Sequence, residues 1–137
     1  MASALEDKDA IREVLAQYCF HLDGGSFDEM AALFTEDGIW HTDFGKGVGR
    51  AGIAEHARSL RAGSAPRPRG VHLCTNISIA LDGDRARVRS NWFVAQNSDS
   101  GPKVSSAGGY IDDMVKRDGR WLFQYRKIDR FIAEGKF

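Results

Sequence analysis

The second half of this sequence consists of four long runs in which polar and apolar residues alternate, and tight turns join the runs in pairs. Asp82-Gly83-Asp84 separates the first two runs, and Arg117-Asp118-Gly119 separates the last two. An Asp-Gly step between alternating runs is a strong signal for a β-hairpin. The sequence therefore predicts two antiparallel hairpins, so any fold must accommodate four long strands. The runs cover residues 71–81, 85–96, 104–116 and 120–132.

The beginning of the chain follows a helical pattern instead. Apolar residues recur every three or four positions over residues 7–22, which is the spacing of one helix face. Asp7 or Asp9 can cap the start of this helix. Asp23-Gly24-Gly25 ends it, because glycine readily takes the left-handed conformation that closes a helix, and we expect Asp23 to lie just beyond the last turn. The apolar face consists of Ile11, Val14, Leu15, Tyr18 and Leu22.

Two further helices and a short strand fill the stretch before the first hairpin. Ser26 and Glu29 have the spacing of a capping box, which predicts the start of a second helix. A short strand is expected over residues 39–43, followed by a glycine-rich loop and a third helix over residues 49–60. Residues 61–70 contain two prolines and are predicted to form a loop. The apolar face of the second helix is Phe27, Met30, Leu33 and Phe34.

Helices followed by a run of strands indicate an α+β fold, in which the helices pack on one face of a curved sheet. The chain has 137 residues, of which 42% are hydrophobic, so we expect one core and a single domain over residues 1–137. Arg85, Arg87 and Arg89 alternate with apolar residues along one strand. We expect this arginine side to be the solvated outer face of the sheet.

Charge and hydropathy exclude several classes of protein. Lys+Arg and Asp+Glu both total 19, which gives no argument for a nucleic-acid partner. Residues 1–45 carry ten acids against Lys8 and Arg12, and we interpret the opposite excess elsewhere as attraction within one fold. No apolar run approaches the roughly 20 residues of a membrane span, and no basic segment precedes an apolar one at the start. A cytoplasmic protein with no membrane partner is expected, in which Cys19 and Cys74 are buried free thiols rather than a disulfide.

Several short motifs, taken in order, resemble the SnoaL-like branch of the nuclear transport factor 2 superfamily over nearly the whole chain. The resemblance implies a cone-shaped α+β barrel, in which a strongly curved, mainly antiparallel sheet wraps around three N-terminal helices and leaves an apolar pocket. It also implies a homo-oligomer, either a dimer or a trimer. The motifs are Tyr18 with Asp23, Phe27-x-x-Met30-x-x-Leu33-Phe34-x-x-Asp37-Gly38, Gly49-Arg50, His72-Leu73-Cys74-Thr75-Asn76, Gly108-Gly109-Tyr110 and Arg117-Asp118-Gly119-Arg120-Trp121.

Within this superfamily, Asp23 and His72 look like the Asp–His pair of scytalone dehydratase, bile acid 7α-dehydratase and hexachlorocyclohexane dehydrochlorinase. The resemblance implies that both residues are catalytic and that no cofactor is needed. The sequence departs from these enzymes at other pocket positions. Gln96 stands where the two dehydratases have a histidine or an aspartate, Tyr110 where scytalone dehydratase has an asparagine, and Tyr18 where the dehydrochlorinase has a lysine. These departures leave the pair intact and the substrate open.

An aspartate beside a histidine is useful in acid–base chemistry. A carboxylate that accepts the imidazole N–H fixes the tautomer of His72 and stabilises the imidazolium that forms after proton abstraction. An apolar pocket screens this attraction little. The alternative is structural: Asp23 caps the helix turn and His72 is a hydrogen-bonded core residue. The resemblance favours the catalytic pair.

The other candidate site residues are aromatic or neutral. Tyr18 lies on the apolar helix face, and its buried hydroxyl needs a partner such as a substrate oxygen. The resemblance points Gln96 and Tyr110 inward, and Gln96 can polarise a carbonyl but cannot titrate. His41 lies in a short strand whose facing the sequence does not fix. The candidate substrate-binding residues are Tyr18, Trp40, His41, Trp92, Gln96 and Tyr110.

The sequence contains no motif that indicates metal-dependent or nucleotide-dependent chemistry. His21-Leu22-Asp23 and His41-Thr42-Asp43 have the spacing of a two-histidine iron site, but this spacing is common by chance and no metal site is predicted. Together with the resemblance, the sequence predicts a cofactor-independent enzyme that abstracts a proton from a small, largely apolar ring compound. The reaction is dehydration or another elimination, or isomerisation or cyclisation. The alternative is a non-catalytic SnoaL-like ligand-binding or assembly subunit, as in the β-subunits of ring-hydroxylating dioxygenases.

Overall fold

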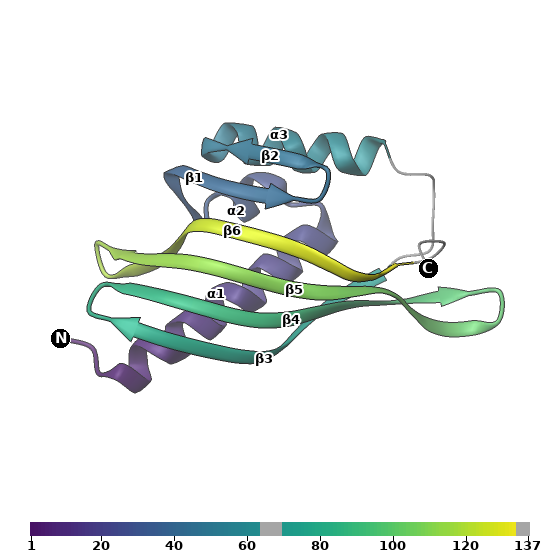
Figure 1. Ribbon diagram of the computed structural model, residues 1–137. Helices are drawn as coiled ribbons and strands as arrows, with labels where there is room; N and C mark the ends of the chain where they lie inside the picture. The colour runs from purple at the N-terminus through teal and green to yellow at the C-terminus, as the bar shows by residue number, and fades with distance from the viewer. Residues whose placement is uncertain (64–69, 134–137) are drawn as a thin grey trace.

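The computed structural model describes residues 1–63 and 70–133, and this part of the chain forms three helices and six strands (Figure 1). Residues 64–69, which make up most of the loop predicted after the third helix, lie outside the described residues. The helices are α1 (Ala4–Gly24), α2 (Phe27–Ala31) and α3 (Gly49–Ala62). The strands are β1 (Phe34–Thr42), β2 (Gly45–Val48), β3 (Gly70–Asp82), β4 (Arg85–Ser98), β5 (Gly101–Arg117) and β6 (Arg120–Ala133).

The six strands form one sheet in the order β2-β1-β6-β5-β4-β3. The hairpins β3–β4 and β5–β6 are those predicted from the Asp-Gly turns. Neighbouring strands are antiparallel except β1 and β6, which are parallel. The sheet is curved and open, with β2 and β3 at its edges, and α1 crosses behind it in the view of Figure 1, packed against β3 and β6. The α+β class and the curved, mainly antiparallel sheet are confirmed.

Helix α1 begins earlier than the predicted residue 7. The Ser3 hydroxyl accepts a hydrogen bond from the Glu6 N–H (3.1 Å), and the Glu6 carboxylate accepts one from the Ser3 N–H (2.8 Å). This reciprocal capping box satisfies two N–H groups at the helix start. Asp7, one of the two predicted caps, instead accepts hydrogen bonds from Trp121 Nε1 (2.9 Å) and Lys116 Nζ (3.0 Å). It therefore ties α1 to the β5–β6 hairpin rather than capping the helix.

The glycine pair closes α1 as predicted, because Gly25 takes the left-handed conformation (φ 75°). Asp23, however, lies within the last helical turn and not beyond it. The predicted capping box of the next helix does not form, since the Ser26 side chain makes no cap hydrogen bond. Helix α2 is also shorter than its apolar pattern, because Phe34 already begins β1 and lies opposite Phe123 of β6.

The glycine-rich segment after β1 was expected to be a loop, and it contains the strand β2. This strand pairs with β1, with Trp40 opposite Gly47. Its glycines have no side chains that could show the alternation of a strand. Gly47 is required by packing, because a Cβ at this position would lie 2.7 Å from Cα of Ile53 in α3.

The two faces of the sheet differ as predicted from the alternation. Arg85, Arg87 and Arg89 are exposed on the outer face, whereas Val88 and Trp92 are buried on the inner face. The cysteines are free thiols, Cys19 buried and Cys74 half-buried. No helix within residues 1–63 and 70–133 is long and apolar enough to cross a membrane.

Gly108 is expected to be the least replaceable glycine of the sheet. It lies where the β5–β6 register shifts, and an added Cβ would overlap the carbonyl oxygen of Asp129. Forcing the strands apart typically costs about 1–3 kcal/mol. Gly108→Ala should therefore lower the melting temperature by roughly 5–10 °C in a thermal melt. Gly52→Ala is the control, because Gly52 lies in α3 with space for a Cβ. The melting temperature of this variant should equal or exceed that of the unsubstituted protein.

Candidate active site

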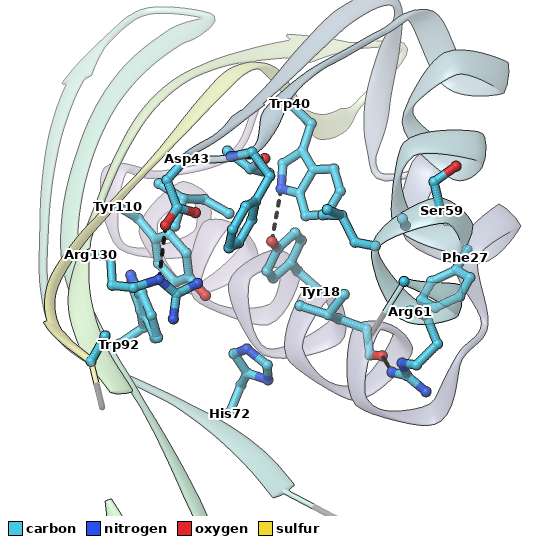
Figure 2. Close-up of a pocket in the computed structure, with 18 residues that line it drawn as sticks. Tyr18, Phe27, Trp40, Asp43, Ser59, Arg61, His72, Trp92, Tyr110 and Arg130 are labelled. Carbon is cyan, nitrogen blue, oxygen red and sulfur yellow. Dashed lines mark hydrogen bonds and ion pairs between the residues drawn. The ribbon is translucent and has the colours of Figure 1, made fainter. Parts of the chain in front are cut away.

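A pocket of about 570 Å³ opens between α1, α3 and the inner face of the sheet. This volume is ordinary for a site that encloses a small molecule. Its walls are rich in aromatic residues, and Figure 2 shows the side chains of the lining converging on one space. The predicted site residues that line it are Tyr18, Trp40, His72, Trp92 and Tyr110.

Asp23 and His72 are in direct contact, as the sequence predicts. Asp23 Oδ1 lies 2.5 Å from His72 Nδ1, and Asp23 Oδ2 accepts a hydrogen bond from the His72 main-chain N–H at 2.8 Å. An ionised carboxylate only accepts hydrogen bonds, so this contact favours the neutral tautomer of His72 that carries its proton on Nδ1 and its lone pair on Nε2. His72 lines the pocket with a quarter of its side chain exposed, whereas Asp23 is 12% exposed and supports it from behind.

The Tyr18 hydroxyl oxygen takes part in a hydrogen bond with Trp40. Trp40 Nε1 donates a hydrogen bond to the Tyr18 oxygen at 2.9 Å, and an indole N–H can only donate. The Tyr18 oxygen is therefore the acceptor, and its own proton is not used in this hydrogen bond. Burial raises the pKa of Tyr18 well above its usual range, which keeps the hydroxyl protonated.

Trp92 and Tyr110 form the wall of the pocket that lies beside His72. Their rings are stacked with centroids 6.0 Å apart, and the centroid of the His72 ring lies 6.1 Å from that of Trp92. Trp92 Nε1 is anchored by the carbonyls of Gly109 (3.3 Å) and Asp129 (3.2 Å). Trp92 and Tyr110, which are 3% and 1% exposed, therefore form a rigid aromatic wall of the pocket.

A buried ion pair supports this aromatic wall from below. The Arg126 guanidinium lies 3.6 Å from the ring centroid of Tyr110 and 4.2 Å from that of Tyr18. Arg126 Nε and Nη2 donate to the two carboxylate oxygens of Asp112, at 2.8 and 3.2 Å. Both side chains are fully buried, and burial raises the pKa of Asp112 to about 6 despite the opposing charge of Arg126. Sequence analysis did not single out this pair, because charged residues of a strand are ordinarily solvated.

Three charged residues at the pocket were also not predicted. Arg130 Nε donates to Asp43 Oδ2 at 2.9 Å, and its guanidinium lies 5.1 Å from the ring centroid of Trp92. Arg61, at the end of α3, donates from Nη2 to the Leu22 carbonyl at 2.9 Å. In the sequence these residues stand out only as charged positions of an alternating strand or of a helix end. The same pattern is typical of a solvated surface.

Gln96 and His41 do not line the pocket. Gln96 keeps the alternation of β4, because the β3–β4 register runs unbroken from Asn91 to Gln96, but it lies opposite Gly70 at the start of β3, beyond the residues that line the pocket. His41 lies between the buried Trp40 and Thr42 of β1 and therefore faces the other side of the sheet. There its Nδ1 lies 2.7 Å from the Tyr125 hydroxyl. Among the described residues, no three His, Cys, Asp or Glu side chains are grouped so that they could hold a metal ion.

Comparison with known proteins gives a family and a fold. Residues 3–127 match the model of the SnoaL-like domain. A protein of unknown function from Mycobacterium tuberculosis is 30% identical with a TM-score of 0.81, over 93% of this chain and 73% of that chain. A candidate scytalone dehydratase from Novosphingobium aromaticivorans is 25% identical with a TM-score of 0.77, over 97% and 96% of the two chains.

The same comparison also finds a subunit of an assembly. The β subunit of a candidate aromatic-ring-hydroxylating dioxygenase from Novosphingobium aromaticivorans is 20% identical with a TM-score of 0.78, over 96% of this chain and 93% of that chain. At this identity the likeness shows the fold alone. None of the curated proteins matches the sequence.

Proposed function

The chain belongs to the family of SnoaL-like domains, and from that premise we propose that it is a cofactor-independent acid–base enzyme. Its substrate is a small, largely apolar ring compound. Its reaction is an elimination such as dehydration, or an isomerisation or cyclisation that begins with the same proton abstraction. The observation that carries the proposal is the Asp23–His72 pair, because its imidazole borders an aromatic pocket.

His72 is the proposed base. Its Nε2 lone pair takes a proton from a carbon next to an electron-withdrawing group, and the C–H electron pair forms a carbon–carbon double bond. In a dehydration the hydroxyl group leaves with its bonding electrons and receives the proton that His72 has taken, so that water is released and the neutral imidazole is restored. The Asp23 carboxylate stabilises the imidazolium formed in this step, since it accepts the Nδ1 proton.

Tyr18 is the proposed hydrogen-bond donor to the substrate oxygen on which negative charge develops. Tyr18→Phe removes this donor, and we expect kcat to fall by about 10- to 100-fold with a smaller change in KM. The variant also leaves the buried Trp40 N–H without its acceptor, which costs about 1–3 kcal/mol of stability. Trp40→Phe is the control, because it removes the same hydrogen bond and keeps the Tyr18 hydroxyl. Equal losses of kcat in both variants would show that the hydroxyl acts only through packing.

The direct test of the proposal is proton exchange. Small ketones, hydroxy-aromatics, terpenoids and steroids are screened for binding by ligand-observed NMR, and each binder is then incubated with the protein in D₂O. We expect at least one binder to exchange a hydrogen next to its carbonyl, or to be converted, with loss of both in His72→Gln. Binders that neither exchange nor react would overturn the proposed function.

The alternative is a non-catalytic binding or assembly subunit. The structural similarity to a dioxygenase β subunit suggests this alternative. Such a subunit has no need of an imidazole that is held by a carboxylate and open to a cavity. The pocket beside His72 therefore favours the enzyme. A homo-oligomer, dimer or trimer, stays a prediction that light scattering on the purified protein can test.

A further inference from the structure

We propose that the substrate carries a single negative charge, as a carboxylate does, and that Arg61 binds this group at the rim of the pocket. The proposal rests on the proposed function for its site and goes further by naming a chemical class of substrate. Arg61 occupies the last turn of α3, next to the end of α1 that carries Asp23. A carboxylate held there would fix how the ring of the substrate lies relative to His72.

The lack of an ion-pair partner for Arg61 among the described residues supports an anionic ligand. Apart from His72, the charged side chains that line it within the described residues are Asp43, Arg61 and Arg130. Asp43 and Arg130 form an ion pair at 2.9 Å, so their charges cancel. Arg61 forms no ion pair with any described residue, whereas Arg58, one turn earlier in α3, is paired with Asp28 at 2.7 Å. The negative charge of Asp23 is in contact with His72, so Arg61 is the charged side chain of the pocket lining that has no ion-pair partner among the described residues.

Arg61 is also held in place before a ligand arrives. Its Nη2 donates to the Leu22 carbonyl at 2.9 Å, and its guanidinium lies 5.4 Å from the ring centroid of Phe27. This hydrogen bond uses one of five N–H groups of the guanidinium. A side chain that is already ordered loses less conformational entropy on binding. Figure 2 shows Arg61 on the side of the pocket opposite Arg130, with His72 between them in this view.

The charge of the site favours a carboxylate over a more highly charged group. A guanidinium presents parallel N–H groups that match the two oxygens of a carboxylate. One negative charge balances the charge of Arg61, whereas a phosphate monoester would bring a second one close to Asp23. The aromatic side chains of Trp92 and Tyr110 then contact the ring that bears the carboxylate.

The test compares two probes of nearly equal shape, 2-naphthoate and 2-acetylnaphthalene, by isothermal titration calorimetry at neutral pH. We expect the protein to bind the carboxylate at least about fivefold more tightly, the scale of one charge-assisted contact at a partly solvated site. Arg61→Gln should abolish the preference, and Arg61→Lys should retain part of it because the charge remains. Arg58→Gln is the matched control on the same helix and should keep the full preference, and thermal melts confirm that each variant is folded.

The outcomes separate this proposal from the proposed function. Equal binding of the two probes by the unsubstituted protein, or an undiminished preference in folded Arg61→Gln, would overturn the anionic subsite. Asp23→Asn should keep the preference, since binding at Arg61 does not need the catalytic pair. A preference that depends on Arg61, together with no exchange or turnover of any binder, would leave the subsite standing and remove the proposed reaction.

Discussion

Replacing His72 by glutamine or Asp23 by asparagine is expected to lower turnover at least about a hundredfold on any substrate that the pocket converts. His72→Gln removes the lone pair that takes the proton. Asp23→Asn removes the charge that stabilises the imidazolium, and its amide can donate to Nδ1 and force the wrong tautomer. The double variant should be little worse than the worse single variant, because the two residues act as a unit. Product assays at several substrate concentrations measure these losses.

The same pair also has a structural contact, so stability must be measured on the same preparations. Asp23 accepts the main-chain N–H of His72 at 2.8 Å, and asparagine keeps one acceptor for it. Asp28→Asn is the control, since this carboxylate is 76% exposed and pairs with Arg58 outside the pocket. It should change neither turnover nor melting temperature by much. A lower melting temperature with unchanged specific activity in Asp23→Asn would identify the pair as structural.

Arg126→Met is expected to be the most destabilising single substitution of the inner face. It leaves the buried Asp112 carboxylate without its partner, and breaking a buried pair typically costs about 3–5 kcal/mol. A loss of this size corresponds to roughly 10 °C or more in melting temperature. Arg126→Met with Asp112→Leu should recover most of the loss, because neither charge then remains buried. Arg87→Met is the control, since its pair with Asp113 is exposed on the outer face and contributes at most about 1 kcal/mol.

The stability of Arg126→Met should also depend on pH in a defined direction. Burial already raises the pKa of Asp112 to about 6 from its ordinary 3.8, and removing the arginine raises it further. The folded state then binds this proton more tightly than the unfolded state, so the free energy of unfolding increases as the pH falls through the folded-state pKa. Relative to the unsubstituted protein, the variant should melt closer to it at pH 5 than at pH 8. An equal difference at both pH values would show that Asp112 is not buried as a lone acid.

Local signals in the sequence account for most of the elements. The turns with Gly83 and Gly119 form because these glycines take positive φ, at 59° and 76°. The parallel pairing of β1 with β6 could not be predicted, since it joins segments far apart in the chain through no local pattern. The short α2 has the same cause, because pairing in the sheet outweighs the helical spacing of Phe34.

The candidate site was predictable where family motifs and alternation agree. The side chains of Asp23 and His72 are in contact as expected, and the aromatic residues of regular strand segments face the pocket. Gln96 keeps the facing of Trp92 that alternation predicts, but it lies near the end of β4 opposite Gly70 and is not among the residues that line the pocket. Arg61 and Arg126 carry no recognisable spacing. The role of Arg126 arises from its depth of burial, and the one proposed for Arg61 from its lack of an ion-pair partner among the described residues; only tertiary packing decides either.

The central place of β6 has a consequence for the order in which the protein can assemble. Among the described residues, β6 follows the other five strands in sequence and lies between β1 and β5, so it provides the backbone link between the two parts of the sheet. Trp40 and Trp92 belong to opposite parts, and the pocket between them is not enclosed until β6 has paired on both sides. During synthesis, the aromatic side chains of the earlier segments therefore stay exposed to water until β6 has been made, and chains in this state are prone to aggregate. Ligand binding should accordingly appear late in refolding, together with the final strand pairing rather than with the formation of the helices.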